Sequence, residues 1–302
     1  VLPKVSVLVP VYGVERFIER CAVSILEQDY PNIEIVFVDD CTPDRSIEVL
    51  ESVIARYACV KDKVVVLHHA KNKGLAAARE TALLAATGEY VMHVDSDDWI
   101  EPGCIAQMAA LAAREDADMV VGDYSLNHAD VVRYCSARIL NPPCDYAREM
   151  VCRKPLYSYT MWSKLIRRGI HLGALPVEGL DYGEDYATMP RIAALCNKVV
   201  KLDKKVYNYR QGNQESYVCN FSEKSFGNMV AAVELLCRFF QDERHKLSAD
   251  IVNFIKLTNK VFLVTQSSQT SLRLARRAWM MWPDAAGVSR LTRFDKLVYA
   301  LA

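Results

Sequence analysis

The sequence contains no hydrophobic run long enough to span a membrane. No stretch of its 302 residues approaches the roughly 18 to 20 consecutive apolar residues that a transmembrane helix needs. The first residues also do not resemble a signal peptide, because residues 1–4 lead directly into an apolar segment that ends at Pro10. We therefore expect a cytoplasmic protein that is soluble, or at most peripheral at the inner face of a membrane.

Net charge and paired cysteines are missing as well. The chain has 37 lysines and arginines against 37 aspartates and glutamates, so no global field favours nucleic acid as a partner. The ten cysteines are scattered singly, with no CxxC pair and no Cys/His cluster at the spacing of a zinc site. This usage indicates reduced cysteines that serve mostly as small core residues. There are no internal repeats and no low-complexity linker.

What the chain does have is a large apolar fraction arranged in short runs. With 51% hydrophobic residues, 302 residues can bury a substantial core in one large domain or two smaller ones. The first hundred and twenty residues alternate Val-rich strands with amphipathic helices, which predicts an α/β domain with a largely parallel sheet covered on both faces. The expected strands are residues 5–9, 34–38, 64–68, 90–94 and 119–121.

Polar residues gather where these strands end. The loops in question are residues 10–12, 39–44, 71–74 and 95–98. In open parallel sheets ligands bind outside the carboxyl ends of the strands, so we expect a binding site at this edge. Helix capping alone would also explain Asp40, Thr42 and Asp44.

Three carboxylates follow the strand at residues 90–94. In an extended segment alternate side chains point the same way, so Asp95 and Asp97 would lie roughly 6–7 Å apart on one side, with Ser96 and Asp98 on the other. Such a pair could hold one hard divalent cation, Mg²⁺ or Mn²⁺, and leave coordination positions for a phosphate-bearing substrate. The alternative is a solvated acidic loop before the next helix.

A helix that starts after Gly74 carries Arg79 one turn from its N-terminus. Glycine permits close approach of the backbone, and the N-terminus of a helix favours anions. Arg79 could therefore reach a diphosphate or brace the carboxylates, unless it is an ordinary surface arginine.

The regular alternation fails after about Tyr124. Residues 125–160 are mixed, and residues 169–183 form a glycine-punctuated loop of the length that is usually functional or mobile. Glu184 and Asp185 then open a helix, where acidic residues are often only partners of the helix dipole.

The chain looks helical from Ser222 onward. Its last stretch is basic and aromatic, and it would either lie on an anionic membrane surface or pack on the main domain. The residues of this stretch are Arg273, Arg276, Trp279, Trp282, Arg277, Arg290, Arg293, Phe294, Lys296 and Tyr299.

Taken together and in this order, these motifs resemble family 2 glycosyltransferases, inverting enzymes with the GT-A fold that use nucleotide-diphosphate sugars to build bacterial polysaccharides. The resemblance is strong over residues 4–125 and moderate to about residue 216. It rests on the opening strand (residues 5–12), the loop at 38–44, the helix start at 72–79, the D-x-D motif at 95–97, Trp162 to Leu165, and Glu184 with Asp185.

The resemblance implies a role for each matching residue of the donor site. Pro10, Val11 and Tyr12 would pack on the nucleotide base, and Asp40 would accept from its imide. Asp95 would lie near the ribose and the metal, with Asp97 as the direct metal ligand. We also count Ser96 and Arg79 with the donor-binding residues.

Asp185 would be the general base that takes the proton of the acceptor hydroxyl. Two positions depart from the family pattern. Cys41 stands where a glycine is usual, and the segment after Arg210 only loosely matches the loop that closes over the diphosphate.

These expectations define a specific protein. Residues 1–220 would form the GT-A catalytic domain, with a nucleotide-binding half (1–125) and an acceptor-side half (126–220), followed by a helical C-terminal region (221–302). It would transfer sugar from a UDP-sugar donor, with Mn²⁺ or Mg²⁺, to a glycan or lipid-linked acceptor, and homo-oligomerisation stays open.

Two other functions compete with this one. One is a sugar-phosphate nucleotidyltransferase, which would carry a Gly-rich basic loop after the first strand that is not found here. The other is a non-catalytic nucleotide-sugar-binding component of a polysaccharide assembly complex.

Overall fold

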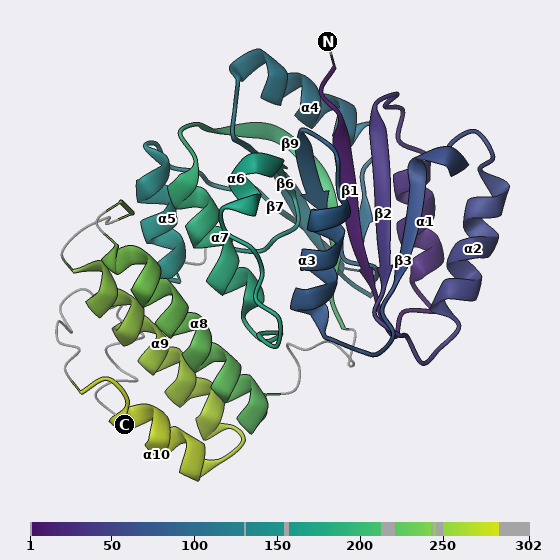
Figure 1. Ribbon diagram of the computed structural model, residues 1–302. Helices are drawn as coiled ribbons and strands as arrows, with labels where there is room; N and C mark the ends of the chain where they lie inside the picture. The colour runs from purple at the N-terminus through teal and green to yellow at the C-terminus, as the bar shows by residue number, and fades with distance from the viewer. Residues whose placement is uncertain are drawn as a thin grey trace.

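A single twisted sheet forms the centre of the molecule, with helices on both faces (Figure 1). The computed structural model describes residues 2–129, 131–153, 157–212, 221–242, 244–245 and 250–283. In these residues the strands run in the order β3-β2-β1-β4-β8-β6-β9-β5, with β7 paired to β6.

The first half of the sheet is parallel, as the alternating pattern predicts. Its strands are β1 (Val5–Val11), β2 (Ile33–Asp39), β3 (Val64–His68) and β4 (Tyr90–His93). The connecting helices are α1 (Ile18–Leu26), α2 (Ser46–Arg56), after which comes the short η1 (Lys61–Lys63), and α3 (Leu75–Ala85). The register pairs Val11 with Asp39 and Leu8 with His93, so the loops after these strands meet at one edge.

The second half of the sheet mixes directions. Strands β8 (Lys164–Arg167) and β5 (Trp99–Ile100) run antiparallel to their neighbours, whereas β9 (Val199–Arg210) is parallel to β6 (Met119–His128). The helices here are α4 (Cys104–Glu115), α5 (Pro143–Val151), α6 (Arg168–Leu172) and α7 (Glu184–Leu195). Strand β7 (Val131–Cys135) forms a hairpin with β6.

Two hydrophobic clusters cover the two faces of the sheet. Residues Val5, Val7 and Val9 of β1 point into one cluster together with α1, α2 and α4. Leu8 points into the other, which contains α3, α5 and α7 and continues into the C-terminal helices. Because β1 is buried on both faces, apolar residues follow one another along it without polar alternation.

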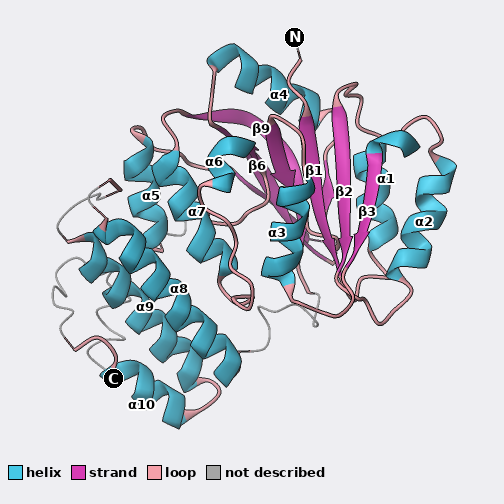
Figure 2. Ribbon diagram, in the orientation of Figure 1, coloured by secondary structure: helices cyan, strands magenta, loops and turns pink. Residues whose placement is uncertain are grey.

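The C-terminal region is helical, as expected. Figure 2 shows α8 (Glu223–Gln241), α9 (Ile251–Ser268) and α10 (Leu272–Met280) grouped beside α5 and α7. These helices share the second hydrophobic cluster with α5 and α7. The described residues include no helix long and apolar enough to cross a membrane.

The middle of the chain is more regular than the sequence suggests. Residues 125–160 contain the end of β6, strand β7 and helix α5, and the predicted loop at 169–183 begins with α6. Strand β9 was not predicted. Its exposed residues are Asp203 and Lys204, and with Lys201 they interrupt any apolar run, so the strand forms through its pairing with β6 and β5.

Candidate active site

The carboxylates after β4 lie in a tight turn. The Asp98 amide donates to the Asp95 carbonyl at 3.0 Å, which closes a turn over residues 95–98. The predicted extended backbone of residues 95–98 is therefore wrong. Asp95 and Asp97 are half-buried, whereas Ser96 and Asp98 are buried. A turn replaces the extended chain because the Asp98 side chain finds buried partners of its own.

Those partners come from β9. The Tyr207 hydroxyl donates to Asp98 Oδ2 at 2.8 Å and accepts from the Asp95 amide at 3.0 Å. The Arg210 amide donates to Asp98 Oδ1 at 2.7 Å. Asp98 therefore has a structural role, because it joins the D-x-D turn to β9. The Arg210 guanidinium donates to the Asp97 carbonyl at 2.9 Å, so it lies beside the turn.

Arg79 is the centre of the site. Its side chain is 2% exposed, and Nη2 lies 2.9 Å from Asp95 Oδ1 and 3.8 Å from Asp185 Oδ1, while Nε lies 3.0 Å from Glu184 Oε1. One buried guanidinium therefore joins the acidic turn after β4 to the start of α7. Of the two roles considered for Arg79, the structure shows the bracing of carboxylates. Its contact with the donor stays a prediction.

Burial and crowding set the ionisation of these groups. Burial raises the pKa of Asp95 to about 6; Arg79 opposes this, whereas Asp185 and Asp97 add to it. Burial also raises the pKa of Glu184 well above its ordinary value, again against Arg79 and with help from Asp185. The carboxylates outnumber the guanidinium, so ionisation of all three would leave an excess of negative charge that a further cation would offset.

A divalent cation fits this arrangement if the substrate supplies part of its coordination. Among the described residues no three His, Cys, Asp or Glu side chains converge as a metal centre. Asp95 and Asp97 offer oxygen ligands beside the excess negative charge, and Mg²⁺ in phosphate sites is commonly held by one or two carboxylates with substrate phosphates and water. The metal assignment of Asp95 and Asp97 stays a prediction.

The predicted nucleotide-base residues meet at the adjoining strand ends. Pro10 and Val11 end β1 in buried positions, and Tyr12 beyond them is 46% exposed. The Asp40 amide donates to the Val11 carbonyl at 3.0 Å, which holds the two loops together.

The Asp40 carboxylate already has several partners. It accepts from the Lys73 and Gly74 amides, both at 2.8 Å, and its Oδ1 lies 2.6 Å from His69 Nδ1. Asp40 thus fixes the start of α3, the helix that carries Arg79. The predicted contact with the imide of the nucleotide base would use a lone pair of the Asp40 carboxylate that these three bonds do not occupy.

Cys41 adopts the conformation that its family position requires. Its φ is +56°, in the left-handed region that a glycine enters without strain. The turn after β2 therefore forms although a cysteine stands where the family usually has a glycine. At the end of the loop, Asp44 accepts from the Ser46 amide at 3.1 Å at the start of α2.

Lys164 is fully buried near Asp185. It donates to the Thr160 carbonyl at 2.7 Å. Burial lowers its pKa to about 7, although the nearby Asp185 carboxylate opposes this effect. Lys164 therefore changes its charge near neutral pH.

Comparison with known proteins agrees with this geometry. The model of the family described as glycosyl transferase family 2 matches residues 6–171, which include β2 to β8, most of β1, the D-x-D turn and Arg79 but not β9. The chain is 30% identical to the putative glycosyltransferase EpsH of Bacillus subtilis over 275 residues, covering 87% of this chain and 77% of EpsH. The chain belongs to glycosyl transferase family 2.

Other relatives place this family 2 glycosyltransferase among enzymes of the same class. It is 32% identical to the uncharacterized glycosyltransferase EpsJ of B. subtilis, over 70% of this chain and 62% of EpsJ. Its fold is that of TarS residues 1–349 from S. aureus in complex with UDP-GlcNAc, with a TM-score of 0.64, 20% identity, and coverage of 91% and 90% of the two chains. The fold is thus the expected GT-A fold, and the protein is an enzyme of the glycosyltransferase class.

Several residues of the site were not singled out from the sequence of this glycosyltransferase. Glu184 was noted only as a first-turn acid, yet it contacts Arg79, and Tyr207 links β9 to the D-x-D turn. The dipeptide Glu184-Asp185 is the one local signal that marks Glu184. Nothing near Tyr207 in the sequence points to a turn more than a hundred residues earlier.

Proposed function

We propose that this family 2 glycosyltransferase moves a sugar, with inversion, from a UDP-sugar to a hydroxyl of a glycan or lipid-linked oligosaccharide in bacterial polysaccharide biosynthesis. The observation that carries the proposal is the Arg79 cluster, which joins Asp95 of the D-x-D turn to Asp185 at the start of α7. A donor-side carboxylate and a candidate base thus lie around one guanidinium.

The Asp185 carboxylate is suited to receive a proton. Its side chain is 23% exposed, whereas its Oδ1 is buried 3.8 Å from Arg79 Nη2, so the exposed part of the carboxylate would meet the acceptor. In the proposed step Asp185 takes the proton of the acceptor hydroxyl while that oxygen bonds to the anomeric carbon. The bond from this carbon to the diphosphate breaks on the opposite face, and its electron pair leaves with UDP.

Other residues would hold the donor during this step. Asp95 and Asp97 would bind Mn²⁺ or Mg²⁺, which when bound would neutralise negative charge on the diphosphate. Pro10, Val11 and Tyr12 would contact the base beside Asp40. In support, two proteins of the same fold have been solved with such ligands: TarS with UDP-GlcNAc, and the mannosyltransferase PcManGT of Pyrobaculum calidifontis with GDP-Man and Mn²⁺ (TM-score 0.55, 20% identity, coverage of 100% of this chain and 87% of PcManGT).

Substitution of Asp185 tests the chemistry. Because a positioned base contributes about 10²–10⁴-fold, Asp185→Asn should reduce turnover of the best UDP-sugar by that factor, with UDP affinity in Mn²⁺ within about twofold of the wild type. The control is Asp203→Asn, an exposed carboxylate on β9. Near-normal turnover in Asp185→Asn would move the base elsewhere. UDP binding with no turnover of any donor by the wild type would favour a non-catalytic component.

A crystal grown with UDP and Mn²⁺ tests the donor site. Electron density for the metal should lie on Asp97, with Asp95 close to the ribose. A diphosphate bound elsewhere, with both carboxylates unoccupied, would refute the assignment.

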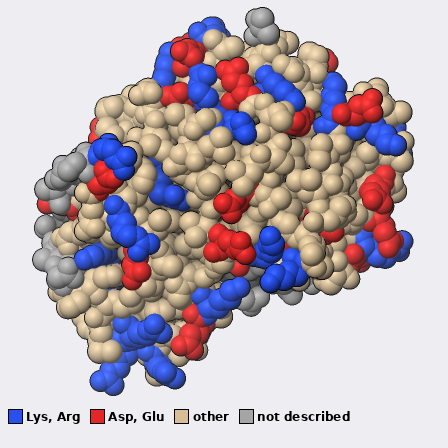
Figure 3. All heavy atoms as spheres, in the orientation of Figure 1, with Lys and Arg blue, Asp and Glu red and all other residues tan. Residues whose placement is uncertain are grey.

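The exposed arginines of helix α10 support the prediction that the C-terminal region contacts a membrane. Leu274 and Ala278 are buried against the protein, whereas Arg273 and Arg276 are exposed and pair with no described carboxylate. Figure 3 shows Lys and Arg gathered at the lower left of the molecule, the end at which α10 lies in Figure 1. We propose that this surface contacts anionic lipid, beside a lipid-linked acceptor. The remaining basic and aromatic residues of the tail (Arg290, Arg293, Phe294, Lys296 and Tyr299) lie outside the described residues.

A further inference from the structure

The candidate base lies in the first turn of helix α7, and this helix has no side-chain cap. Helix α7 begins after Gly183, whose φ is +81°, and no side chain caps its N-terminus. Helix ends need partners for their backbone groups, and the position of Glu184 and Asp185 depends on how the preceding residues are held. The constraint must therefore come from other elements.

Asn228 of α8 supplies most of that constraint. Its Oδ1 accepts from the amides of Asp181 at 3.2 Å and Tyr182 at 3.1 Å, and its Nδ2 donates to the Gly179 carbonyl at 2.9 Å. One side-chain amide thus satisfies three backbone groups within four consecutive residues. All three bonds lie just before the residues that contact Arg79.

Neighbouring contacts restrict the same loop from both sides. Lys224, one turn before Asn228, lies 3.3 Å from Asp181 Oδ2. A Cβ atom on Gly183 would lie 2.4 Å from Met229 Cε, and one on Gly74 would lie 2.1 Å from Asp181 Oδ1. The loop is therefore packed between α8 and the start of α3.

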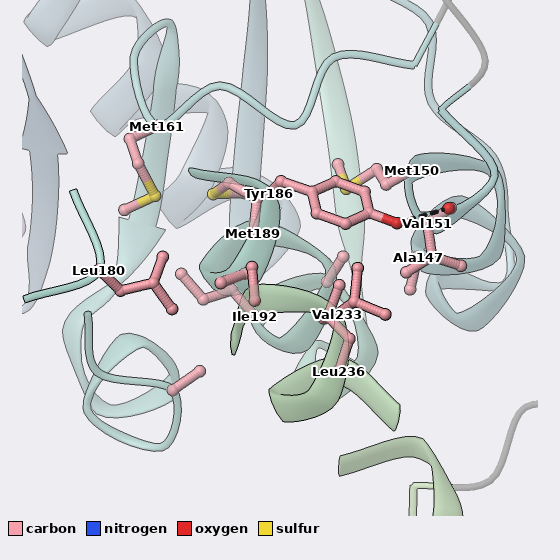
Figure 4. Packing of buried hydrophobic residues seen from close by; sticks show 14 of the residues in the cluster. Ala147, Met150, Val151, Met161, Leu180, Tyr186, Met189, Ile192, Val233 and Leu236 are labelled. Carbon is pink, nitrogen blue, oxygen red and sulfur yellow. Dashed lines mark hydrogen bonds between the residues drawn. The ribbon is translucent and has the colours of Figure 1, made fainter. Parts of the chain in front are cut away.

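The first turn of α7 is tied to the C-terminal helices as well. The Tyr186 hydroxyl accepts from Asn259 of α9 at 2.6 Å and donates to the Val151 carbonyl at 2.8 Å. Figure 4 shows Tyr186 beside Val151, and Ile192 of α7 level with Val233 of α8, in the hydrophobic cluster that also contains Met189 and Leu236. Asp185 therefore lies between two residues, Gly183 and Tyr186, that the C-terminal helices hold.

We propose that Asn228 is a positioning residue for catalysis, through which the C-terminal helices place Asp185 against Arg79 and the bound donor. The proposal rests on the proposed role of Asp185 as the base. It assigns a catalytic purpose to a region beyond the residues that the family model matches. The hydrogen bonds that Asn228 makes with described residues all go to backbone atoms of the loop.

The test compares Asn228→Ala, which removes all three bonds, with Asn228→Asp, which keeps the acceptor oxygen and loses the donor. Because a displacement of about 1 Å can cost on the order of 10²-fold in rate, Asn228→Ala should lower kcat for the best UDP-sugar by about ten- to a hundred-fold. Asn228→Asp should lie between it and the wild type. The Kd for UDP with Mn²⁺ should stay within about twofold in both, because Asn228 does not touch the donor strand ends.

Val230→Ala is the control for destabilisation alone. Val230 lies on the same helix, half-buried against the same cluster. At an equal loss of Tm it should keep kcat, whereas an equal loss of kcat in both variants would overturn the proposal. If Asn228→Ala does not fold, Asn228→Asp decides the matter: wild-type kcat in that variant would refute the positioning role.

The two proposals fail in different ways. Normal turnover in Asp185→Asn would refute the base, whatever Asn228 does. A loss of turnover in Asp185→Asn together with normal kcat in Asn228→Ala would leave the base in place and refute the role of Asn228.

Discussion

Lys164 shows how the site shapes a single residue. An ammonium group in a fully buried position is destabilised, and its pKa falls from 10.5 to about 7. Its hydrogen bond to the Thr160 carbonyl persists in either protonation state, because the neutral amine also donates. The residue is thus a titrating group beside the candidate base.

This burial makes stability depend on pH. Between about pH 7 and 10.5 the unfolded chain carries the Lys164 proton and the folded protein does not, so the free energy of unfolding rises with pH by about 1.4 kcal/mol per unit from this group. In Lys164→Met that contribution is absent. The free energy of unfolding of the wild type minus that of Lys164→Met should rise with pH above pH 7 and stay constant below it. Urea unfolding from pH 6 to 10 measures both free energies. Parallel curves would show that Lys164 keeps its ordinary pKa.

Tyr207 carries a second residue-scale prediction. Its hydroxyl holds both Asp98 and the Asp95 amide, so Tyr207→Phe removes the partner of Asp98 Oδ2, which is buried, and that of the Asp95 amide. We expect a loss of about 1–3 kcal/mol in the free energy of unfolding and weaker binding of UDP with Mn²⁺, because the turn carries Asp97. Calorimetric titration measures the affinity.

Tyr30→Phe is the matched control for this prediction. The Tyr30 hydroxyl is buried and donates to the Pro3 carbonyl, away from the site. This variant should lose stability and keep UDP affinity. Equal UDP affinities in Tyr207→Phe and Tyr30→Phe would show that Tyr207 does not influence the donor site.

At the scale of elements, α10 shows the packing that one interpretation of the basic tail predicts, and membrane contact stays a prediction. Leu274 and Ala278 pack on the protein, and the opposite side presents arginines with Leu272 and Met280, which are 81% and 62% exposed. Arg277 lies 3.7 Å from Glu223 of α8, and this acidic partner offsets part of its charge. A helix can thus be packed and still offer a cationic face.

Charge reversal tests this face. Arg273→Glu with Arg276→Glu should weaken partitioning onto phosphatidylglycerol vesicles by at least about 1 kcal/mol per arginine, and added salt should weaken the wild type in the same way. The control reverses Arg114 and Arg138, which are exposed elsewhere. Equal partitioning of the two double variants in sedimentation would leave α10 with a packing role only.

At the scale of the whole molecule, one hydrophobic cluster runs from the sheet to the last described helices. It includes Leu8 of β1, Tyr186 of α7, Phe226 and Leu236 of α8, and Ala278 of α10. The division of the chain at residue 220 stays a prediction, and this shared core gives a way to test it.

A chain ended at residue 220 would expose the apolar faces of α5 and α7 that α8 and α9 cover. Because burial of such surface is the main favourable term in folding, we expect the shortened protein to aggregate or to lose cooperative unfolding. Thermal unfolding with light scattering measures both. A soluble, cooperative fragment that binds UDP would establish residues 1–220 as an independent domain.

The local pattern of residues was sufficient for the first half of the fold. Strands β1 to β4 lie close to their predicted positions, with the predicted helices between them, because each element has a periodicity that only its own neighbours determine. The order of the loops also brought Pro10, Asp40 and Asp95 to one edge, since parallel strands end together. These features do not depend on what the distant chain does.

Long-range packing decided the rest of the site. Asp95 to Asp98 form a turn because Tyr207 and Arg210 of β9 hold Asp98, and β9 itself exists because β6 pairs with it. Whether Arg79 met a diphosphate, solvent or carboxylates depended on where α7 lies. Contacts between residues a hundred positions apart leave no periodic trace in the sequence, so only the tertiary structure could show that Glu184 and Asp185 share one guanidinium with Asp95.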